Sequence, residues 1–97
     1  MVRHIVAWNF KEGANPQEDG AKIKTVLEGL KGEIAGLVEI KVYRDLVGTS
    51  NRQIVLDSLF EDEAALAAYQ VHPKHVEAAA FVGSVTVDRV CMDYHEI

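Results

Sequence analysis

The 97-residue sequence has a single cysteine, Cys91, and few basic residues: 10 lysines and arginines stand against 15 acidic residues, for a formal net charge of -5. One cysteine excludes an intrachain disulfide and is typical of proteins from a reducing compartment. The acidic balance argues against nucleic acids and anionic membranes as partners, because both are bound through basic patches.

Long hydrophobic runs are also missing. The apolar stretch near the N-terminus is interrupted by Asn9 and Lys11, and no small-residue cleavage site follows it, so no signal peptide is predicted. No run approaches the length that a transmembrane helix needs. These observations predict one domain over residues 1–97, located in the cytoplasm.

Three classes of motif are absent as well. The sequence contains no G-x-x-x-x-G-K-[ST], no G-x-G-x-x-G after the first predicted strand and no C-x-x-C. These absences remove support for a phosphate-binding loop, a nucleotide-binding fold and a structural zinc site. Cys91 falls within a predicted strand, where an inert buried thiol is the usual case. We therefore predict no cofactor and no metal.

Hydrophobic residues make up 48% of the chain and are distributed in short periodic segments. Apolar alternation predicts strands over residues 2–10, 37–46, 52–60 and 84–94. A capping box formed by Asn15 and Glu18 predicts the start of a helix that Gly36 ends. A second helical region is predicted to begin at the acidic residues 61–63, to break at Pro73 and to end near Phe81.

The order of these elements, βαββαβ, predicts an α+β protein with the ferredoxin-like arrangement. Its four-stranded antiparallel sheet would carry the helices on one face. The other face would be bare, although Ile5, Ala7, Val55 and Leu59 make it apolar in its central strands. We therefore predict a homodimer in which the open sheet faces of two chains pack together.

The segment from Tyr69 to His75 concentrates the titratable side chains of the sequence around Pro73. An elbow between two helices would aim Tyr69 and His75 toward the sheet, where His4 lies on the first strand. Desolvated imidazoles stay neutral and can accept a proton, and a nearby phenol can donate to a developing oxyanion. The alternative is a buried group of hydrogen-bonding side chains that only satisfies the core.

The other histidines are predicted to have structural or solvent-exposed positions. His72 and His75 would share a face of an unbroken helix and could chelate a metal, but Pro73 breaks that helix. A cap at the elbow is therefore the favoured role of His72. His95, near the C-terminus, is predicted to be solvated.

The segment from Phe60 to Val76, with its Y-x-x-H-P-x-H-V block, resembles the stress-responsive α/β-barrel (Dabb) domain family. The residues from Arg3 to Lys11 resemble its first strand, and Met92-Asp93-Tyr94 resembles its last. The resemblance implies ferredoxin-like monomers that pair sheet to sheet as a dimeric α/β barrel. One plant branch of this family cyclises a linear polyketide without a cofactor.

In that branch the tyrosine and second histidine of the block carry the chemistry, and they match Tyr69 and His75. The resemblance thus implies that His75 is a general base removing an α-proton, that Tyr69 steadies the enolate or carbonyl, and that His4 orients the ligand. Apolar side chains would shape the cavity and bind a small apolar or aromatic ligand: Trp8, Phe10, Ile23, Leu27, Phe81, Val90 and Met92.

Three functions follow as hypotheses. The first is a small cofactor-free cyclase or isomerase acting on a β-keto or aromatic substrate. The second is a non-catalytic stress-response or small-ligand-binding homodimer, in which the same side chains only close the core. The third is a cofactor-free oxygenase or haem-handling barrel, with His75 as the haem ligand.

Overall fold

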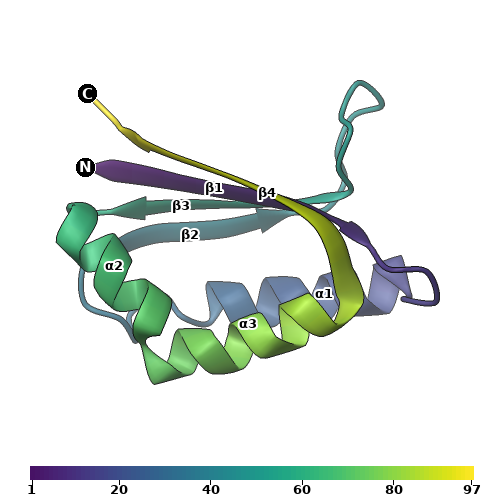
Figure 1. The fold of residues 1–97 in the computed structure, drawn as a ribbon, viewed down its shortest axis with the longest axis horizontal. Coiled ribbons are helices and arrows are strands. Elements are labelled where there is room, and N and C mark those ends of the chain that lie inside the picture. Colours follow the sequence, from purple (N-terminus) through teal and green to yellow (C-terminus); the bar gives the residue numbers. More distant parts are fainter.

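The computed structural model describes all 97 residues. The chain forms β1 (Val2–Phe10), α1 (Pro16–Glu28), β2 (Leu37–Tyr43), β3 (Ile54–Phe60), α2 (Glu63–Val71), α3 (Pro73–Val85) and β4 (Thr86–His95). The strands form one antiparallel sheet in the order β2-β3-β1-β4. All three helices cover the same face of this sheet, as Figure 1 shows. The predicted ferredoxin-like α+β arrangement is confirmed, and no helix is long and apolar enough to cross a membrane.

The core lies between the sheet and the helices. Strand β1 alternates strictly, with His4, Val6 and Trp8 buried on the helix-covered face and Ile5 and Ala7 half-buried on the other. We call these the inward and the outward face of the sheet. Fully burying an apolar side chain of this size contributes about 1.5–3 kcal/mol, so the inward face provides most of the stability.

Helix α1 begins as the sequence predicts but ends earlier. The Asn15 side chain accepts hydrogen bonds from the amides of Gln17 and Glu18, both at 3.1 Å, and so satisfies the first turn. In the reciprocal bond the Asn15 amide donates to the carboxylate of Asp19, at 2.9 Å, and not to that of Glu18. The capping box is therefore shifted by one residue.

The predicted extension of this helix to Gly36 is wrong. The helix stops at Glu28, and residues 29–36 form turns in which Gly32 and Gly36 both have a φ of +83°. Only glycine adopts this conformation without strain. Leu30 and Ile34 lie in this irregular segment and are nevertheless buried. The apolar spacing thus predicted their burial correctly but predicted a helical backbone that they do not adopt.

The elbow between α2 and α3 is formed by His72 and Pro73. Pro73 disfavours a helical residue before it, and His72 is extended with a ψ of 133°. Nδ1 of His72 accepts a hydrogen bond from the Lys74 amide at 3.1 Å, which confirms the predicted cap. Helix α3 then continues beyond the predicted end at Phe81 to Val85. Its end is satisfied by Thr86, whose hydroxyl donates to the Val82 carbonyl at 2.7 Å.

Strand β4 contains a β-bulge that the sequence analysis does not predict. Its register against β1 shifts between Ala7 and Asn9, which pair with Val90 and Val87. Two residues of β1 thus span three of β4, and the extra residue reverses the alternation of the strand. Asp88 has a φ of 55°, in the left-handed region, and is the only non-glycine residue there. Strands β2 and β3 are shorter than predicted, ending at Tyr43 and beginning at Ile54.

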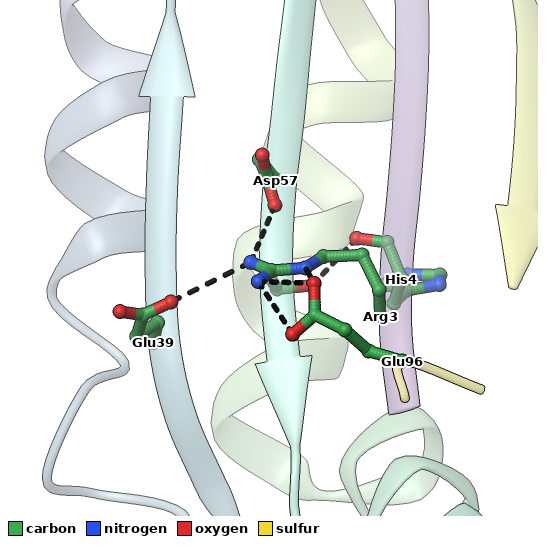
Figure 2. A network of polar contacts seen from close by, with 6 residues as sticks. Arg3, His4, Glu39, Asp57 and Glu96 are labelled. Carbon is green, nitrogen blue, oxygen red and sulfur yellow. Dashed lines mark hydrogen bonds and ion pairs between the residues drawn. The ribbon is translucent and has the colours of Figure 1, made fainter. Parts of the chain in front are cut away.

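The outward face combines an ion-pair network with exposed apolar side chains. Arg3 contacts three carboxylates from three parts of the chain, Asp57 at 3.0 Å, Glu96 at 2.8 Å and Glu39 at 3.5 Å (Figure 2). Large side chains on this face are left open to solvent. They are Tyr43, Val87, Met92 and Tyr94.

Candidate functional site

A cavity of about 500 Å³ lies between the inward face of the sheet and the helices. Its wall is apolar on the side of the core and carries imidazole, guanidinium, amide and thiol groups elsewhere. The lining residues are His4, Val6, Trp8, Leu27, Leu56, Gln70, His75, Ala79, Val82, Gly83, Arg89 and Cys91. A second hollow, of about 660 Å³, lies at the loop after β2 and is lined mainly by polar residues without a histidine.

His4 enters the cavity wall from β1 and is held by the last strand. Only 3% of its surface is exposed, and Nδ1 forms a hydrogen bond with the carboxylate of Asp93, its register partner on β4. Because a carboxylate accepts hydrogen bonds, we assign the proton to Nδ1. The lone pair of His4 is then on Nε2.

His75 enters the wall from the first turn of α3. Its Nδ1 lies 3.4 Å from the carbonyl oxygen of Gln70. A carbonyl only accepts, so Nδ1 donates and Nε2 keeps its lone pair. Partial burial lowers the pKa of His75, the hydrogen bond to the Gln70 carbonyl opposes this shift, and the positive charge of Arg89 adds to it. At neutral pH His75 is therefore a neutral base.

Tyr69 lies against both histidines without bordering the cavity. Its ring centroid is 4.1 Å from that of His75, 4.8 Å from that of Phe60 and 6.1 Å from that of His4. The residue is fully buried, and its hydroxyl has no hydrogen-bond partner. Burial raises the pKa of Tyr69, so the phenol stays protonated and is a donor without an acceptor.

The apolar residues predicted to shape the cavity separate into two groups. Trp8 and Leu27 border it. Ile23 is fully buried in the core, Phe10 borders the second hollow, and Phe81 lies beneath the ammonium group of Lys22 at 4.2 Å. These last three do not line the cavity.

The β-bulge decides the position of the remaining two. Val90 pairs with Ala7 and Met92 with Ile5, so both lie on the outward face, away from the cavity. Cys91 and Asp93, with the opposite phase, share the inward face with His4. Without the extra residue the strand would alternate strictly, and Val90 and Met92 would face the cavity in place of Cys91 and Asp93.

Four polar residues at the site were not predicted to belong to it: Gln70, Arg89, Cys91 and Asp93. The adjacent charges of Asp88 and Arg89, in the middle of a valine-rich strand, were the available signal, because such a pair interrupts the alternation. Cys91 is exposed, which corrects the prediction of a buried thiol. Partial burial and the charge of Asp93 raise the pKa of Cys91, so the thiol is protonated.

The side chains of His4, Cys91 and Asp93 could be considered as metal ligands, since their ligand atoms lie within 4.8 Å of one another. The Nδ1 atom of His4 is, however, already bonded to Asp93. Arg89 also borders the same cavity and its positive charge opposes a cation there. The arrangement fits a hydrogen-bonded His–Asp pair better than a metal centre.

Comparison with solved structures shows where else this fold occurs. A dimeric protein of unknown function and ferredoxin-like fold from Bacteroides fragilis is 24% identical, with a TM-score of 0.88, over 98% of this chain and 95% of that chain. A hydroxynitrile lyase from Passiflora edulis is 21% identical, with a TM-score of 0.82, over 96% of this chain and 90% of that chain. At these identities the likeness shows the fold.

Sequence comparison identifies the family. A curated relative, the stress-response A/B barrel domain-containing protein HS1 of Arabidopsis thaliana, is 29% identical in an alignment 91 residues long that covers 87% of this chain and 80% of that protein. The model of the stress responsive A/B barrel domain matches residues 2–96, nearly the whole chain. The resemblance drawn from the Y-x-x-H-P-x-H-V block is thus confirmed, and the chain belongs to the Dabb family of stress-responsive A/B barrel domains.

Proposed function

We propose that this protein binds a small, mainly apolar carbonyl compound in the cavity and transfers protons on it without a cofactor, as a cyclase or isomerase of β-keto or aromatic substrates. One observation carries the proposal. His4 and His75, from opposite walls of the domain, border the same cavity, and each has its Nδ1 engaged and its Nε2 free. Two imidazoles prepared in this way can accept and return a proton.

His75 is the general base of this proposal. Its lowered pKa keeps it neutral near pH 7, where it can remove a proton from the carbon next to a carbonyl group. His4 is held by Asp93, which fixes the ring and its tautomer, so its Nε2 lone pair accepts a hydrogen bond from the enol hydroxyl of the ligand and orients it. The two roles differ because only His4 has a carboxylate partner.

Tyr69 supplies the donor for the oxygen of a developing enolate. Its hydroxyl is protonated, lacks a partner and lies beside His75. A donor of this kind stabilises negative charge strongly in a site from which water is excluded. Since the phenol does not border the cavity, the His75 ring has to shift for a ligand to reach it.

Exchange of carbon-bound protons tests the proposal before the natural substrate is known. We would follow deuterium incorporation into 4-phenylbutan-2-one in D₂O by NMR, with the protein and with an equal concentration of imidazole. Acceleration by the protein, lost by about 100-fold in His75→Gln, is expected for general base catalysis. His95→Gln removes an exposed imidazole outside the cavity and is the matched control. Exchange no faster than with imidazole would overturn the proposal.

A second candidate is a non-catalytic ligand-binding or stress-response homodimer. The complete burial of Tyr69 favours it, because a side chain sealed in the core contributes to packing whether or not turnover occurs. In that case His75→Gln would lower the melting temperature but leave the exchange rate at the level of free imidazole. The hydroxynitrile lyase shares the fold alone, so it supports neither candidate over the other.

The proposed assembly is a homodimer formed through the outward face. Ile5, Ala7 and Val55 are only half-covered in the single chain, and Met92 and Tyr94 beside them are exposed. Such a continuous apolar surface is typical of an interface between copies. Sedimentation should give a dimer at micromolar concentration and a monomer for Met92→Asp. A wild-type monomer at that concentration would contradict this assembly.

The proposed location is the cytoplasm. Cys91 is free and exposed, and a thiol in this state persists in a reducing compartment. Fractionation of cells that express the tagged full chain would test the location.

A further inference from the structure

We infer that Arg89 binds a carboxylate of the ligand, so that the carbonyl compound of the proposed function is also an organic acid. This inference rests on the proposed function, because it names the substrate class for the same cavity. It starts from a positive charge that the fold places in a mainly apolar wall and leaves without a carboxylate partner.

Arg89 differs from the other three arginines of the chain in its contacts. Arg3 pairs with carboxylates, Arg44 donates to the Gln17 carbonyl at 2.9 Å, and Arg52 donates to the Asp88 carbonyl at 2.8 Å. Arg89 borders the cavity, is exposed to solvent and forms no ion pair, and its one polar side-chain contact is with the Cys91 thiol beside it. Its guanidinium is therefore free for a ligand.

The β-bulge is what brings Arg89 into the wall. Asp88 keeps a left-handed conformation that costs free energy for a residue with a side chain. It is held on two sides, by Asn9, which donates to its carboxylate at 3.1 Å, and by Arg52, which donates to its carbonyl. Bulges of this kind commonly redirect a side chain next to a functional site.

The charges around Arg89 leave room for an anion. None of the residues that line the cavity is acidic. The carboxylate of Asp93, on the same face of β4 as Cys91, is bonded to His4. His75 adds no negative charge, and the Gln70 amide in the wall can donate a further hydrogen bond.

The rest of the wall defines the shape of the acid. Trp8, Leu27 and Val82 make the part of the cavity near the core apolar. A ligand with a carboxylate on Arg89 and a hydrocarbon or aromatic body against these residues would satisfy both regions. A guanidinium binds a carboxylate through two parallel hydrogen bonds, which also fixes the orientation of the ligand toward His75.

The test compares two probes that differ only in charge, 4-phenylbutanoate and 4-phenylbutanamide. Trp8 is the only tryptophan and borders the cavity, so its fluorescence reports binding of either probe. We expect the wild type to bind the acid at least about tenfold more tightly than the amide, as a charge-assisted pair implies. Arg89→Gln should bind the two equally, and Arg89→Lys should keep part of the preference.

Arg44→Gln is the matched control, since it removes the same charge from a residue outside this cavity. It should leave the preference for the acid unchanged. Equal binding of acid and amide by the wild type, or a preference that survives in Arg89→Gln, would overturn the role of Arg89 and leave the proposed function standing. Failure of both probes to bind at millimolar concentration would overturn the two proposals together.

Discussion

The two faces of the sheet use the same four strands but treat their polar groups in opposite ways. On the outward face Arg3 is surrounded by carboxylates from β2, β3 and the chain end, so its charge is neutralised within the chain. On the inward face Arg89 is exposed at the cavity and pairs with no carboxylate, and the Tyr69 hydroxyl is buried without a partner. A buried polar group without a hydrogen bond is costly in a folded protein, so the retention of the Tyr69 hydroxyl indicates a use that the chain alone does not fulfil.

The difference separates the two surfaces by the kind of partner that fits them. The outward face carries the ion-pair network of Arg3 across its central strands and has exposed apolar side chains beside it, as a protein interface requires. The inward face encloses a hollow with free hydrogen-bonding groups, as a small ligand requires. The following variants are paired across the sheet to test this contrast.

The largest expected effect comes from two residues of β3 that point to opposite faces. Phe60 is fully buried inward, and Phe60→Ala should lower the free energy of unfolding by about 3–5 kcal/mol, because it leaves a cavity against Tyr69. Urea denaturation at fixed protein concentration measures the loss. Val55→Ala, on the outward face, should cost less, because Val55 is only half-buried in the single chain, and its cost should rise with protein concentration if the proposed dimer forms. An identical, concentration-independent loss for both would remove the contrast.

A smaller effect is expected from two aspartates. Asp93→Ala leaves the buried Nδ1 of His4 without its partner, and should destabilise the protein by about 1–3 kcal/mol. Asp57→Ala removes one of three carboxylates around Arg3, and should cost at most about 1 kcal/mol. Chemical denaturation measures both, and ¹⁵N spectra of His4 should show loss of the fixed Nδ1–H tautomer in the first variant alone. Equal losses would mean that His4 is no more dependent on its carboxylate than Arg3 is.

Tyr69→Phe should raise stability. The hydroxyl that it removes is buried without a hydrogen-bond partner, so the unfavourable desolvation disappears while the ring packing remains. A gain of about 1 kcal/mol is expected in the free energy of unfolding, measured by denaturation. Tyr94→Phe, which removes an exposed hydroxyl from the outward face, should be neutral. A loss of stability in Tyr69→Phe would show that the hydroxyl has a structural partner.

The smallest effect is the pH dependence that His75 confers. Burial lowers the pKa of His75 below the ordinary value of 6.5, so the unfolded chain binds its proton more readily than the folded one. This contribution to stability is therefore complete above about pH 6.5 and is lost as the pH falls toward the folded pKa. Melting temperatures between pH 5 and 8 should fall less steeply at the acid end for His75→Gln than for the wild type. Parallel curves would contradict the lowered pKa.

Local features of the chain were predicted well from the sequence. Asn15 caps α1, His72 caps α3 and Pro73 forms the elbow, because capping and proline effects act over a few residues. The end of α1 was misplaced because Leu30 and Ile34 keep helical spacing in a segment that glycines hold in turns. The spacing of apolar residues indicates which side chains are buried, and these two are buried although the helix has already ended.

The site was predicted only in part, because its composition depends on the register between distant strands. The residues of the elbow and of β1 carried a recognisable pattern, but one extra residue in β4 determines which of its side chains face the helices. The only local sequence signal for this change in the alternation of β4 is the adjacent pair of charges, Asp88 and Arg89. Val90 and Met92 were consequently assigned to the cavity, and Arg89 and Asp93 were overlooked.

The sequence by itself determined the order of the elements, the capped and broken helices, the bare sheet face and the family. These follow from spacing and from residue-specific backbone preferences, which are properties of neighbouring positions. Only the tertiary structure decided that His4 meets Asp93 across the sheet, that Tyr69 is sealed beside His75, and that Arg89 enters the cavity alone. Each of these depends on strand register and on helix packing, which are set by contacts between residues far apart in the chain.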